Sequence, residues 1–386
     1  MKEIQILNSI SPVAAEAMGS EYTLVKESAA PEGILVRSFD MHDMDVPASV
    51  LAVARAGAGT NNIPIDEMSQ KGIAVFNTPG ANANAVAELV LTGLLLASRD
   101  VVSGIEWARG LAGQEGVAKL VEKGKSQFVG PEIAGKTLGV IGLGAIGARV
   151  ANNAVHLGMN VIGYDPFLTV KNAFFLSRQV KYTQSIQDIW TECDYVTLHL
   201  PLNNDTRGTV NAEVLGMMKD GAALLNFARG ELVDTDALLA AVASGKLRRY
   251  VTDFPNEKLL NVKGVVAIPH LGASTPESED NCARMAGEEL KAYIEEGVIR
   301  NSVNLPAMEL PPLTGHRISV IHKNVPNILS AITSAVAGVG LNIENMVNSS
   351  RGAMACTVLD THSPVPAEAV EAIAARPDML KVRVIR

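Results

Sequence analysis

Several polar side chains in the second half of the chain suit proton transfer beside a bound carboxylate. Arg229 follows an apolar segment in N-F-A-R-G-E, and a guanidinium can hold a carboxylate through two parallel hydrogen bonds. His270 follows another apolar segment in P-H-L-G-A-S-T, and imidazole exchanges protons near neutral pH. Between them, Asp253 and Glu257 offer carboxylates that can orient the imidazole. Taken singly, Arg229 is equally consistent with a surface ion pair, and His270 with a structural role.

A glycine-rich turn precedes these residues in the chain. Gly142 opens the sequence G-L-G-A-I-G directly after the apolar segment 137–141, where a tight turn is needed. Gly144 lets the backbone approach a pyrophosphate, and Gly147 lets a helix close on the sheet with its N–H groups toward the phosphates. Asp165 ends the next apolar segment, where its carboxylate suits ribose hydroxyls and repels a 2′-phosphate. The pattern predicts a dinucleotide site that favours NAD over NADP.

Apolar segments that alternate with helical patterns predict two parallel sheets, and ligands of such sheets bind at the carboxyl ends of the strands. The expected strands of the first sheet are 2–8, 21–26, 33–38, 51–56 and 72–76. Those of the second are 137–141, 160–164, 195–200, 222–227, 249–253 and 265–268. The polar residues at the ends of the second set are Asp165, His199, Arg229, Asp253 and His270.

Two helices and a proline-rich segment set the remaining organisation. An apolar helix is expected over 85–97 and another helix over 278–296, after which three prolines in residues 306–312 indicate an extended linker. The tail beyond it has the order β-α-β-β-α-β of a small ferredoxin-like unit. Its expected elements are strand 317–322, helix 326–339, strands 342–347 and 353–359, helix 366–375 and strand 380–385. Such a unit serves as a dimerisation module or as a ligand sensor.

Composition restricts the class of protein. The chain has 386 residues, 47% of them hydrophobic, so we expect two or three domains. A net charge of −8 argues against nucleic acid as a partner. Three widely spaced cysteines without metal-ligand spacing predict no metal site and a reducing, cytoplasmic location. We also expect no membrane segment, because the longest apolar run, 89–97, is too short to cross a bilayer.

Together these motifs resemble the D-isomer-specific 2-hydroxyacid dehydrogenases, and R-A-G-A-G-T-N at 55–61 and N-T-P-G-A-N at 77–82 extend the likeness to the first sheet. The resemblance implies a Rossmann doubly wound sheet inserted in a flavodoxin-like substrate domain, followed by a ferredoxin-like ACT domain. The implied boundaries are 1–90 completed by 275–304 for substrate, 91–274 for NAD, 305–312 for the linker and 313–386 for the regulatory ACT domain.

Within that family the resemblance narrows to enzymes that use NAD to oxidise D-3-phosphoglycerate to 3-phosphohydroxypyruvate, the first step of L-serine biosynthesis. It implies that His270 is the base, that Glu257 orients it, and that Arg229 clamps the substrate carboxylate. Two alternatives stay open. One is another 2-hydroxyacid dehydrogenase, a reductase of glyoxylate, hydroxypyruvate or 2-oxoglutarate. The other is a non-enzymatic NAD-sensing interaction module.

The resemblance also assigns the remaining contacts residue by residue. The implied cofactor contacts are Thr78, Gly142, Gly144, Ala145, Ile146, Gly147, Asp165, Leu200, Phe227, Ala228, Asp253, Leu271, Gly272 and Ala273. The implied substrate contacts are Arg55, Gly57, Ala58 and Asn82. As a hypothesis, L-serine binds the terminal unit at His322, Asn324 and Asn342. A homodimer or homotetramer is expected.

Overall fold

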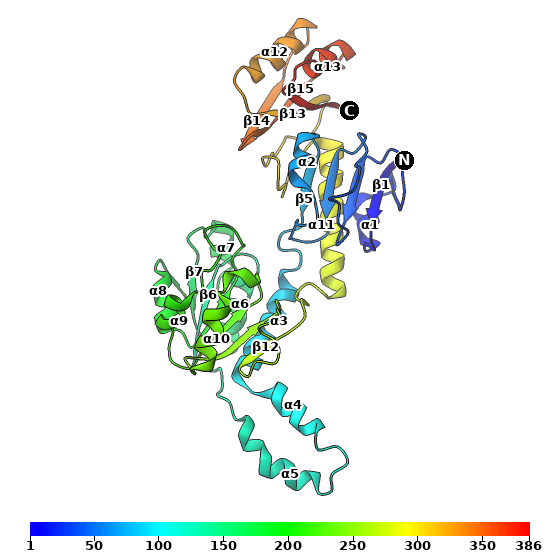
Figure 1. Cartoon of the computed structure of the whole chain (residues 1–386). Coiled ribbons are helices and arrows are strands. Elements are labelled where there is room, and N and C mark those ends of the chain that lie inside the picture. The colour runs from blue at the N-terminus through cyan, green and yellow to red at the C-terminus, as the bar shows by residue number, and fades with distance from the viewer. The chain divides into compact units, whose positions relative to one another are not determined.

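The computed structural model describes residues 1–386 (Figure 1). The chain divides into two compact units: Met1–Asn82 with Pro276–Arg386, and Ala83–Thr275. The chain leaves the first unit at the start of helix α3 (Ala83–Ser98) and returns at the start of helix α11 (Pro276–Glu296). The boundary that we predicted at residue 90 therefore falls inside α3.

The first unit contains a parallel five-stranded sheet in the order β2-β1-β3-β4-β5. Its strands are β1 (Lys2–Leu7), β2 (Tyr22–Val25), β3 (Gly33–Val36), β4 (Ala52–Arg55) and β5 (Ala74–Asn77), as predicted to within a few residues at the ends. Its short helices are α1 (Val13–Met18) and α2 (Ile65–Gln70). Helix α11 covers one face, where Leu290 and Tyr293 join Ile4 and Leu35 in the core and the rings of Phe76 and Tyr293 lie 5.5 Å apart.

The second unit contains a parallel seven-stranded sheet in the order β12-β11-β10-β9-β6-β7-β8. The strands are β6 (Thr137–Ile141), β7 (Asn160–Tyr164), β8 (Val180–Thr183), β9 (Tyr195–Leu198), β10 (Ala222–Asn226), β11 (Leu247–Thr252) and β12 (Val265–Ala267). The strand order reverses beside β6, and such a switch point is where Rossmann-type sheets bind ligands. Our prediction of six strands omitted the edge strand β8.

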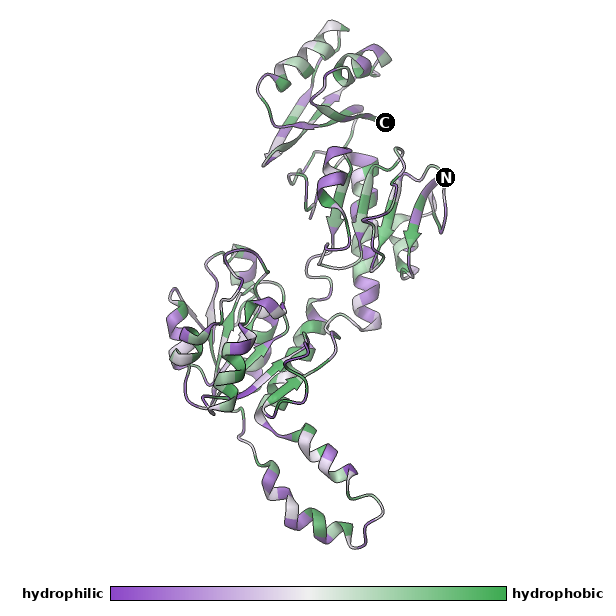
Figure 2. Ribbon diagram, viewed as in Figure 1, coloured by the Kyte–Doolittle hydropathy of each residue, from purple (hydrophilic) through white to green (hydrophobic).

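Helices cover both faces of this sheet, so its central strands β6, β9 and β10 are mostly apolar (Figure 2). Helices α3 and α6 pack on one face, and α8, α9 and α10 pack on the other. The helices not yet delimited are α6 (Gly147–His156), α7 (Val170–Phe175), α8 (Ile186–Glu192), α9 (Ala212–Met217) and α10 (Thr235–Ala243), with a 3-10 turn, η2, at Gly230–Leu232. Gly93 of α3 leaves room for the Phe227 ring, since a Cβ there would come 2.6 Å from Phe227 Cζ.

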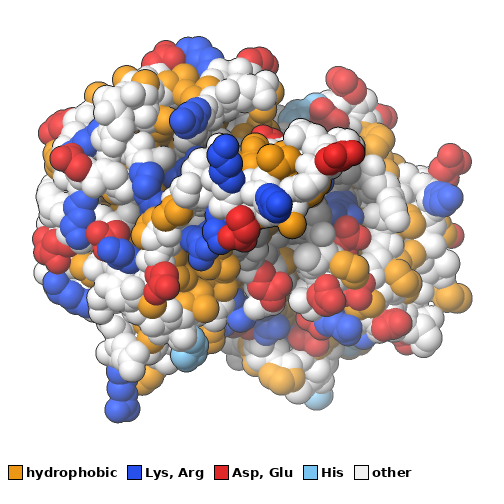
Figure 3. All heavy atoms as spheres, turned by 90° about the horizontal axis from the view of Figure 1, so that it is seen from below, with side chains coloured by type: hydrophobic (Ala, Val, Ile, Leu, Met, Phe, Trp, Pro, Cys, Tyr) orange, Lys and Arg blue, Asp and Glu red, His pale blue; other side chains and the backbone are white.

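An arm of two helices, α4 (Val101–Arg109) and α5 (Val117–Gly124), extends this unit and ends in the 3-10 turn η1 (Lys125–Phe128). Neither helix contains a buried residue. The rings of Trp107 and Phe128 lie 5.4 Å apart, and Val101, Ile105 and Val117 stay exposed. Figure 3 views the molecule from the side of this arm and shows hydrophobic side chains between charged ones. The arm thus presents apolar surface to solvent.

The tail forms an antiparallel four-stranded sheet in the order β14-β15-β13-β16. Its elements are β13 (His316–Lys323), α12 (Ile328–Gly338), β14 (Asn345–Arg351), β15 (Met354–Thr361), α13 (Ala367–Ala374) and β16 (Met379–Ile385), which is the predicted element order. The predicted strand 342–347 begins later, at Asn345, so Asn342 precedes it.

Basic side chains of the tail are bonded to the end of α11. Arg317 is fully buried, pairs with Asp360 at 2.6 Å, and donates to the Glu296 and Pro311 carbonyls. Arg383 stacks on Tyr293, with its guanidinium carbon 4.3 Å from the ring centroid. The bond from Arg317 to the Glu296 carbonyl, and one from Arg383 Nη1 to the Ile294 carbonyl at 3.0 Å, satisfy carbonyls that the end of α11 leaves open. No helix in the structure combines the length and apolar character that crossing a bilayer requires.

Candidate active site

The glycine turn has the geometry that a bound pyrophosphate needs. Gly142 has φ of +90°, and a Cβ there would meet the carbonyl of His199. A Cβ on Gly147 would overlap the Gly142 carbonyl, whereas nothing lies within 4 Å of the Cβ position at Gly144. Helix α6 begins at Gly147, so its free N–H groups border that open space. The loop therefore fits the phosphates of a dinucleotide.

Asp165 lies at the end of β7 and connects back to the glycine turn. Its Oδ2 accepts a hydrogen bond from the Leu143 N–H at 2.8 Å, and its Oδ1 accepts one from the Phe167 N–H at 2.8 Å. Each carboxylate oxygen keeps a second lone pair for an outside donor. Asp165 can thus fix the turn and still accept hydrogen bonds from a ribose.

His199 follows β9 and lies beneath the glycine turn rather than among the reacting groups. Its Nε2 lies 3.1 Å from Thr197 Oγ1, and burial lowers its pKa to about 3. The imidazole is therefore neutral at physiological pH. Its carbonyl and its ring occupy the space that a Cβ on Gly142 or Gly147 would need.

Buried Asn226 at the end of β10 shapes the turn that presents Arg229. Its Nδ2 donates to the Arg229 carbonyl at 2.8 Å, and its Oδ1 accepts from the Ala228 N–H at 3.2 Å. The Arg229 side chain is exposed, and its guanidinium carbon lies 6.0 Å from the centre of the Phe254 ring. We had not predicted a role for Asn226, although the motif N-F-A-R-G-E contains it.

Asp253, Phe254 and His270 line one cavity of about 600 Å³ in the second unit, together with residues that follow β10. The rings of Phe254 and His270 lie 4.6 Å apart, with an angle of 50° between their planes. Asp253 is 2% exposed, and its Oδ1 is buried without a hydrogen-bond partner. Burial raises the pKa of Asp253, while the charges of His270 and Arg229 oppose that rise. The predicted arginine and histidine therefore lie around one buried carboxylate.

Glu257 lies on the exposed loop after β11 and is absent from the wall of that cavity. The loop is held to α10 by its neighbours: Asn256 Nδ2 donates to Thr235 Oγ1 at 3.5 Å, and Lys258 pairs with Asp236 at 2.6 Å. Glu257 itself forms no hydrogen bond or ion pair. Its predicted role as the partner of His270 stays a prediction.

The other predicted cofactor residues of this unit lie along the same edge of the sheet. Ala145 and Ile146 belong to the glycine turn, and Leu200 follows β9. Phe227 and Ala228 are buried in the turn after β10. Leu271, Gly272 and Ala273 follow His270, and the Gly272 N–H stabilises the Asp253 carboxylate. These residues surround the switch point from the side of the strand ends.

The predicted substrate loop lies in the first unit, after β4. Gly57 has φ of +153°, and a Cβ there would collide with the Arg55 guanidinium. Asn77 Nδ2 donates to the Ala58 carbonyl at 2.6 Å, and the Thr78 N–H donates to the Gly57 carbonyl at 3.1 Å. The loop is thus fastened to the end of β5. Thr78 is fully buried there, and Asn82 ends the first part of the unit.

Arg37 is a site candidate that the sequence analysis missed. It follows β3 and lies next to Arg55, because Val36 pairs with Arg55 in the sheet and Arg55 Nε donates to the Arg37 carbonyl at 3.1 Å. Its guanidinium pairs with Glu279 in the first turn of α11 at 2.7 Å. Burial raises the pKa of Cys282, and the positive charges of both arginines oppose that rise. The two guanidinium groups therefore make one basic region.

The predicted effector residues of the tail are partly committed to protein contacts. His322 is buried, with Nδ1 2.8 Å from the Lys323 carbonyl and Nε2 2.8 Å from Thr357 Oγ1. Asn324 Nδ2 donates to the Gly352 carbonyl at 3.1 Å, and Asn342 is exposed. Both ring nitrogens of His322 are thus already bonded within the protein. A ligand could therefore reach polar atoms of Asn324 and Asn342 more easily than those of His322.

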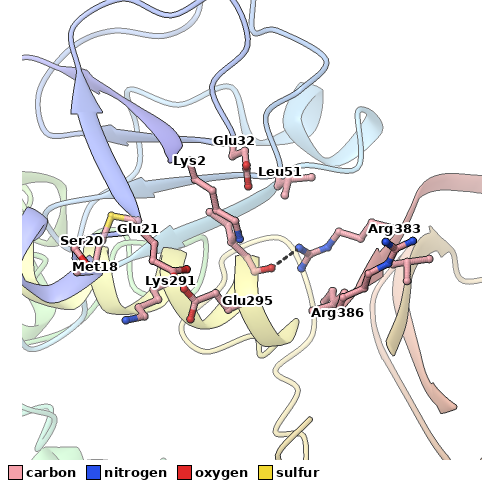
Figure 4. Close-up of a pocket in the computed structure, with 14 residues that line it drawn as sticks. Lys2, Met18, Ser20, Glu21, Glu32, Leu51, Lys291, Glu295, Arg383 and Arg386 are labelled. Carbon is pink, nitrogen blue, oxygen red and sulfur yellow. Dashed lines mark hydrogen bonds between the residues drawn. The ribbon is translucent and has the colours of Figure 1, made fainter. Parts of the chain in front are cut away.

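A second cavity, of about 750 Å³, lies in the first unit between the end of α1, α11 and β16 (Figure 4). Charged side chains of both signs line it, among them Lys2, Glu21, Lys291, Glu295 and Arg383. It contains none of the predicted catalytic, cofactor or substrate residues. The chemistry is therefore assigned to the smaller cavity beside Asp253 and His270.

Comparison with known proteins agrees with this geometry. The family model "D-isomer specific 2-hydroxyacid dehydrogenase, NAD binding domain" matches residues 93–272. D-3-phosphoglycerate dehydrogenase of Escherichia coli (strain K12) is 33% identical over 340 residues, which cover 85% of this chain and 79% of that protein. The chain belongs to the D-isomer-specific 2-hydroxyacid dehydrogenases. The predicted family, the NAD-dependent dehydrogenase activity and the NAD cofactor are thereby confirmed.

Other members of the family are similar to this chain in sequence or in structure. D-3-phosphoglycerate dehydrogenase of Methanocaldococcus jannaschii is 34% identical over 312 residues, which cover 78% of this chain but only 57% of that longer protein. NAD+-bound 3-phosphoglycerate dehydrogenase of Entamoeba histolytica has a TM-score of 0.60 at 26% identity, covering 78% of this chain and 98% of that one. A glyoxylate reductase from Paecilomyes thermophila reaches 0.65 at 27% identity, with the same two coverages.

Proposed function

We propose that the chain oxidises D-3-phosphoglycerate to 3-phosphohydroxypyruvate. The observation that carries this proposal is the arrangement of Arg229 and His270 around one buried carboxylate in an NAD-binding unit. Arg229 holds the substrate carboxylate through two hydrogen bonds and so fixes C2 in place. A nitrogen of His270 takes the proton of the C2 hydroxyl as the carbonyl forms. NAD, when bound, accepts the hydride from C2.

The basic region of the first unit supports a phosphorylated substrate. Arg37 follows β3 and Arg55 ends the neighbouring parallel strand β4, and guanidinium groups suit phosphate oxygens geometrically. In the same loop the Gly57 N–H already donates to the Arg55 carbonyl at 2.8 Å, which leaves the Ala58 N–H to meet a carboxylate or phosphate. We assign the phosphate to the two arginines. D-Glycerate has no phosphate, so the two arginines should not strengthen its binding.

A steady-state assay with both substrates tests this assignment. We expect kcat/KM for D-3-phosphoglycerate to exceed that for D-glycerate by about 100-fold, since charged hydrogen bonds contribute ~1.5–3 kcal/mol each. Arg55→Gln and Arg37→Gln should each lower the value for the phosphorylated substrate about tenfold or more. D-Glycerate serves as the internal control, and its kcat/KM should hardly change. Equal losses on both substrates would remove the arginines from the phosphate site.

Cofactor choice gives a further prediction. Asp165→Ala should raise the KM for NAD about tenfold, because the variant loses charged hydrogen bonds to the ribose and its contact with Leu143. It should also lower the KM for NADP, because the carboxylate no longer repels a 2′-phosphate. The measurement is the ratio of kcat/KM for the two cofactors. A ratio equal to the parent's would mean that residues other than Asp165 select NAD over NADP.

A second candidate function is a glyoxylate or hydroxypyruvate reductase, which the likeness to the Paecilomyes enzyme favours. Arg229 and His270 serve that reaction in the reverse direction just as well. Only the two arginines of the first unit distinguish the candidates. Faster NADH oxidation with glyoxylate than with 3-phosphohydroxypyruvate, at equal subsaturating concentrations, would favour the second.

The tail supports a regulatory role. Its β-α-β-β-α-β order and its antiparallel sheet agree with a ferredoxin-like ACT domain, and the strand order 2-1-3-4-5 of the first sheet agrees with a flavodoxin-like substrate domain. We assign residues 313–386 to the ACT domain. Asn324 and Asn342 are its accessible candidates for L-serine. Inhibition of the assay by L-serine is the corresponding readout.

The α4–α5 arm supports self-association. Its exposed Val101, Ile105 and Val117 form an apolar surface on helices that contain no fully buried residue. We assign this surface to the interface of a homodimer, which can further pair to a tetramer. Sedimentation velocity gives the oligomeric state directly.

A further inference from the structure

We propose that the cavity of about 750 Å³ in the first unit binds a free α-amino acid, which contacts the tail through its carboxylate and the rest of the unit through its ammonium group (Figure 4). The cavity contains none of the residues assigned above to substrate, NAD or L-serine. Its volume lies within the range of about 300–1,000 Å³ that is usual for small-molecule sites. The inference does not depend on the substrate proposed for the chain.

The first argument is the division of charge between the two walls of the cavity. The tail contributes only basic charged side chains, Arg383 near the end of β16 and Arg386 just after it. All the carboxylates come from the opposite side, namely Glu21 before β2, Glu32 before β3 and Glu295 in the last turn of α11. A ligand that carries an anionic and a cationic group can therefore meet complementary charge on both walls at once.

The second argument is the unbalanced charge of Arg383. Its Nη1 donates to the Ile294 carbonyl at 3.0 Å and its Nη2 to the Tyr293 carbonyl, so both acceptors are neutral. Its Nε is buried without a hydrogen-bond partner, and the guanidinium forms no ion pair. A charged group that is partly removed from water is costly unless an opposite charge lies close to it. This wall therefore suits the carboxylate of a ligand.

The third argument is the grouping of the carboxylates around Tyr22. Burial raises the pKa of Tyr22, and the negative charges of Glu21, Glu32 and Glu295 raise it further.

The cations on the same side do not neutralise this group. Lys2 Nζ lies 5.6 Å from the centre of the Tyr22 ring, and Lys291 Nζ lies against the end of α1, 3.6 Å from the Cβ position of Gly19. Neither lysine forms an ion pair, and the three carboxylates outnumber the two lysines. This wall is thus left with one negative charge in excess, which suits an ammonium group.

The position of the cavity gives its ligand a structural consequence. Lys381, on the same strand as Arg383, donates to the carbonyls of Ala48 and Val50, which lie just before β4. Its Cβ also lies 2.9 Å from the Cβ position of Gly72, just before β5. Strand β16 therefore rests on the segments that lead into two strands of the first sheet. An amino acid that contacts both walls stabilises this docking of the tail, because it binds the docked form best.

The first test measures binding of glycine and L-glutamine, a short and a long neutral α-amino acid, to the full chain by isothermal titration calorimetry. Acetate and methylamine each carry only one of the two charges. We expect both to bind at least about 100-fold more weakly than glycine, because each loses the charged contacts of one wall.

Variants then locate the bound amino acid. Glu295→Gln and Arg386→Gln each remove one charge from one wall, so each should raise Kd for both amino acids about tenfold, the scale of one charged hydrogen bond. The matched controls are Glu296→Gln on α11 and Arg376→Gln after α13, because both residues are exposed and lie outside the cavity. Both controls should bind as the parent does, and so should Asn342→Ala in the other candidate site of the tail.

Hydrogen exchange gives a readout that needs no variant. Saturating glycine should slow exchange of the β16 amides relative to the same concentration of acetate, because the ligand opposes separation of the tail from the first sheet. The amides of β8 in the second unit are the internal control, and their exchange should not change. Equal exchange of β16 in glycine and in acetate would contradict the stabilised docking.

Three binding results would overturn the inference. Absence of saturable binding of both amino acids would show that the cavity holds no such ligand. Acetate that binds as tightly as glycine, with no effect of Glu295→Gln, would make the cavity a site for anions alone. Parental affinity in Glu295→Gln and Arg386→Gln, with a loss in Asn342→Ala, would place the amino acid in the tail. None of these measurements involves turnover, so the proposed oxidation of D-3-phosphoglycerate stands or fails separately in its own assay.

Discussion

His270→Ala should lower kcat for D-3-phosphoglycerate by about 100-fold or more, because general acid–base groups contribute factors of ~10²–10⁴. Without the imidazole, water must take the hydroxyl proton in a cavity shaped by Phe254 and Asp253. The NADH dissociation constant should change little, because the glycine turn and Asp165 lie on other strands of the sheet. The measurement is steady-state kinetics at saturating NAD together with a direct binding titration.

A matched control is available in the same unit. His156 is exposed in the last turn of α6, so His156→Ala removes an imidazole without touching the cavity. We expect that variant to keep the parental kcat. If His270→Ala also kept it, the base would be another group and the assigned mechanism would be wrong. A loss of NADH binding in parallel with kcat would instead indicate a collapsed site.

The dinucleotide turn was predictable from sequence because its requirements are local. Gly142 needs a positive φ, and Gly147 has no room for a Cβ, so glycine is dictated at both positions within a few residues of chain. Strand β8 was missed for an equally physical reason. Lys181 and Tyr182 are exposed on this edge strand, so it lacks the apolar run of a buried parallel strand.

The site residues that sequence analysis missed depend on tertiary pairing. In the sequence, Arg37 looks like an ordinary solvated residue after a strand. Its place beside Arg55 follows from the register of β3 and β4, which the sequence does not reveal. The burial of Asp253 and the exposure of Glu257, four positions later, likewise follow from the packing and are not evident from the local sequence. Residue types and strand ends therefore predict the chemistry, whereas the packing decides which side chains lie close to one another.

Arg229→Lys should raise the KM for D-3-phosphoglycerate and lower kcat, with a combined loss in kcat/KM of about 10–100-fold. A lysine keeps the charge but offers one nitrogen where the guanidinium offers a planar pair, so one charged hydrogen bond worth ~1.5–3 kcal/mol is lost. The Asn226 contacts to the Ala228 N–H and the Arg229 carbonyl involve only the backbone of the turn, so they survive the substitution. The variant loses only the hydrogen bond from Arg229 Nη1 to the Ala228 carbonyl, made by an exposed side chain, so the thermal midpoint should stay close to the parent's.

The split between KM and kcat then identifies what Arg229 does. An effect on KM alone would mean that it binds ground state and transition state equally, whereas a fall in kcat means that the clamp also aligns C2 for reaction. Arg178→Lys is the control, because Arg178 is exposed on the segment before β8. Kinetics of Arg229→Lys that match this control would exclude the guanidinium from the site.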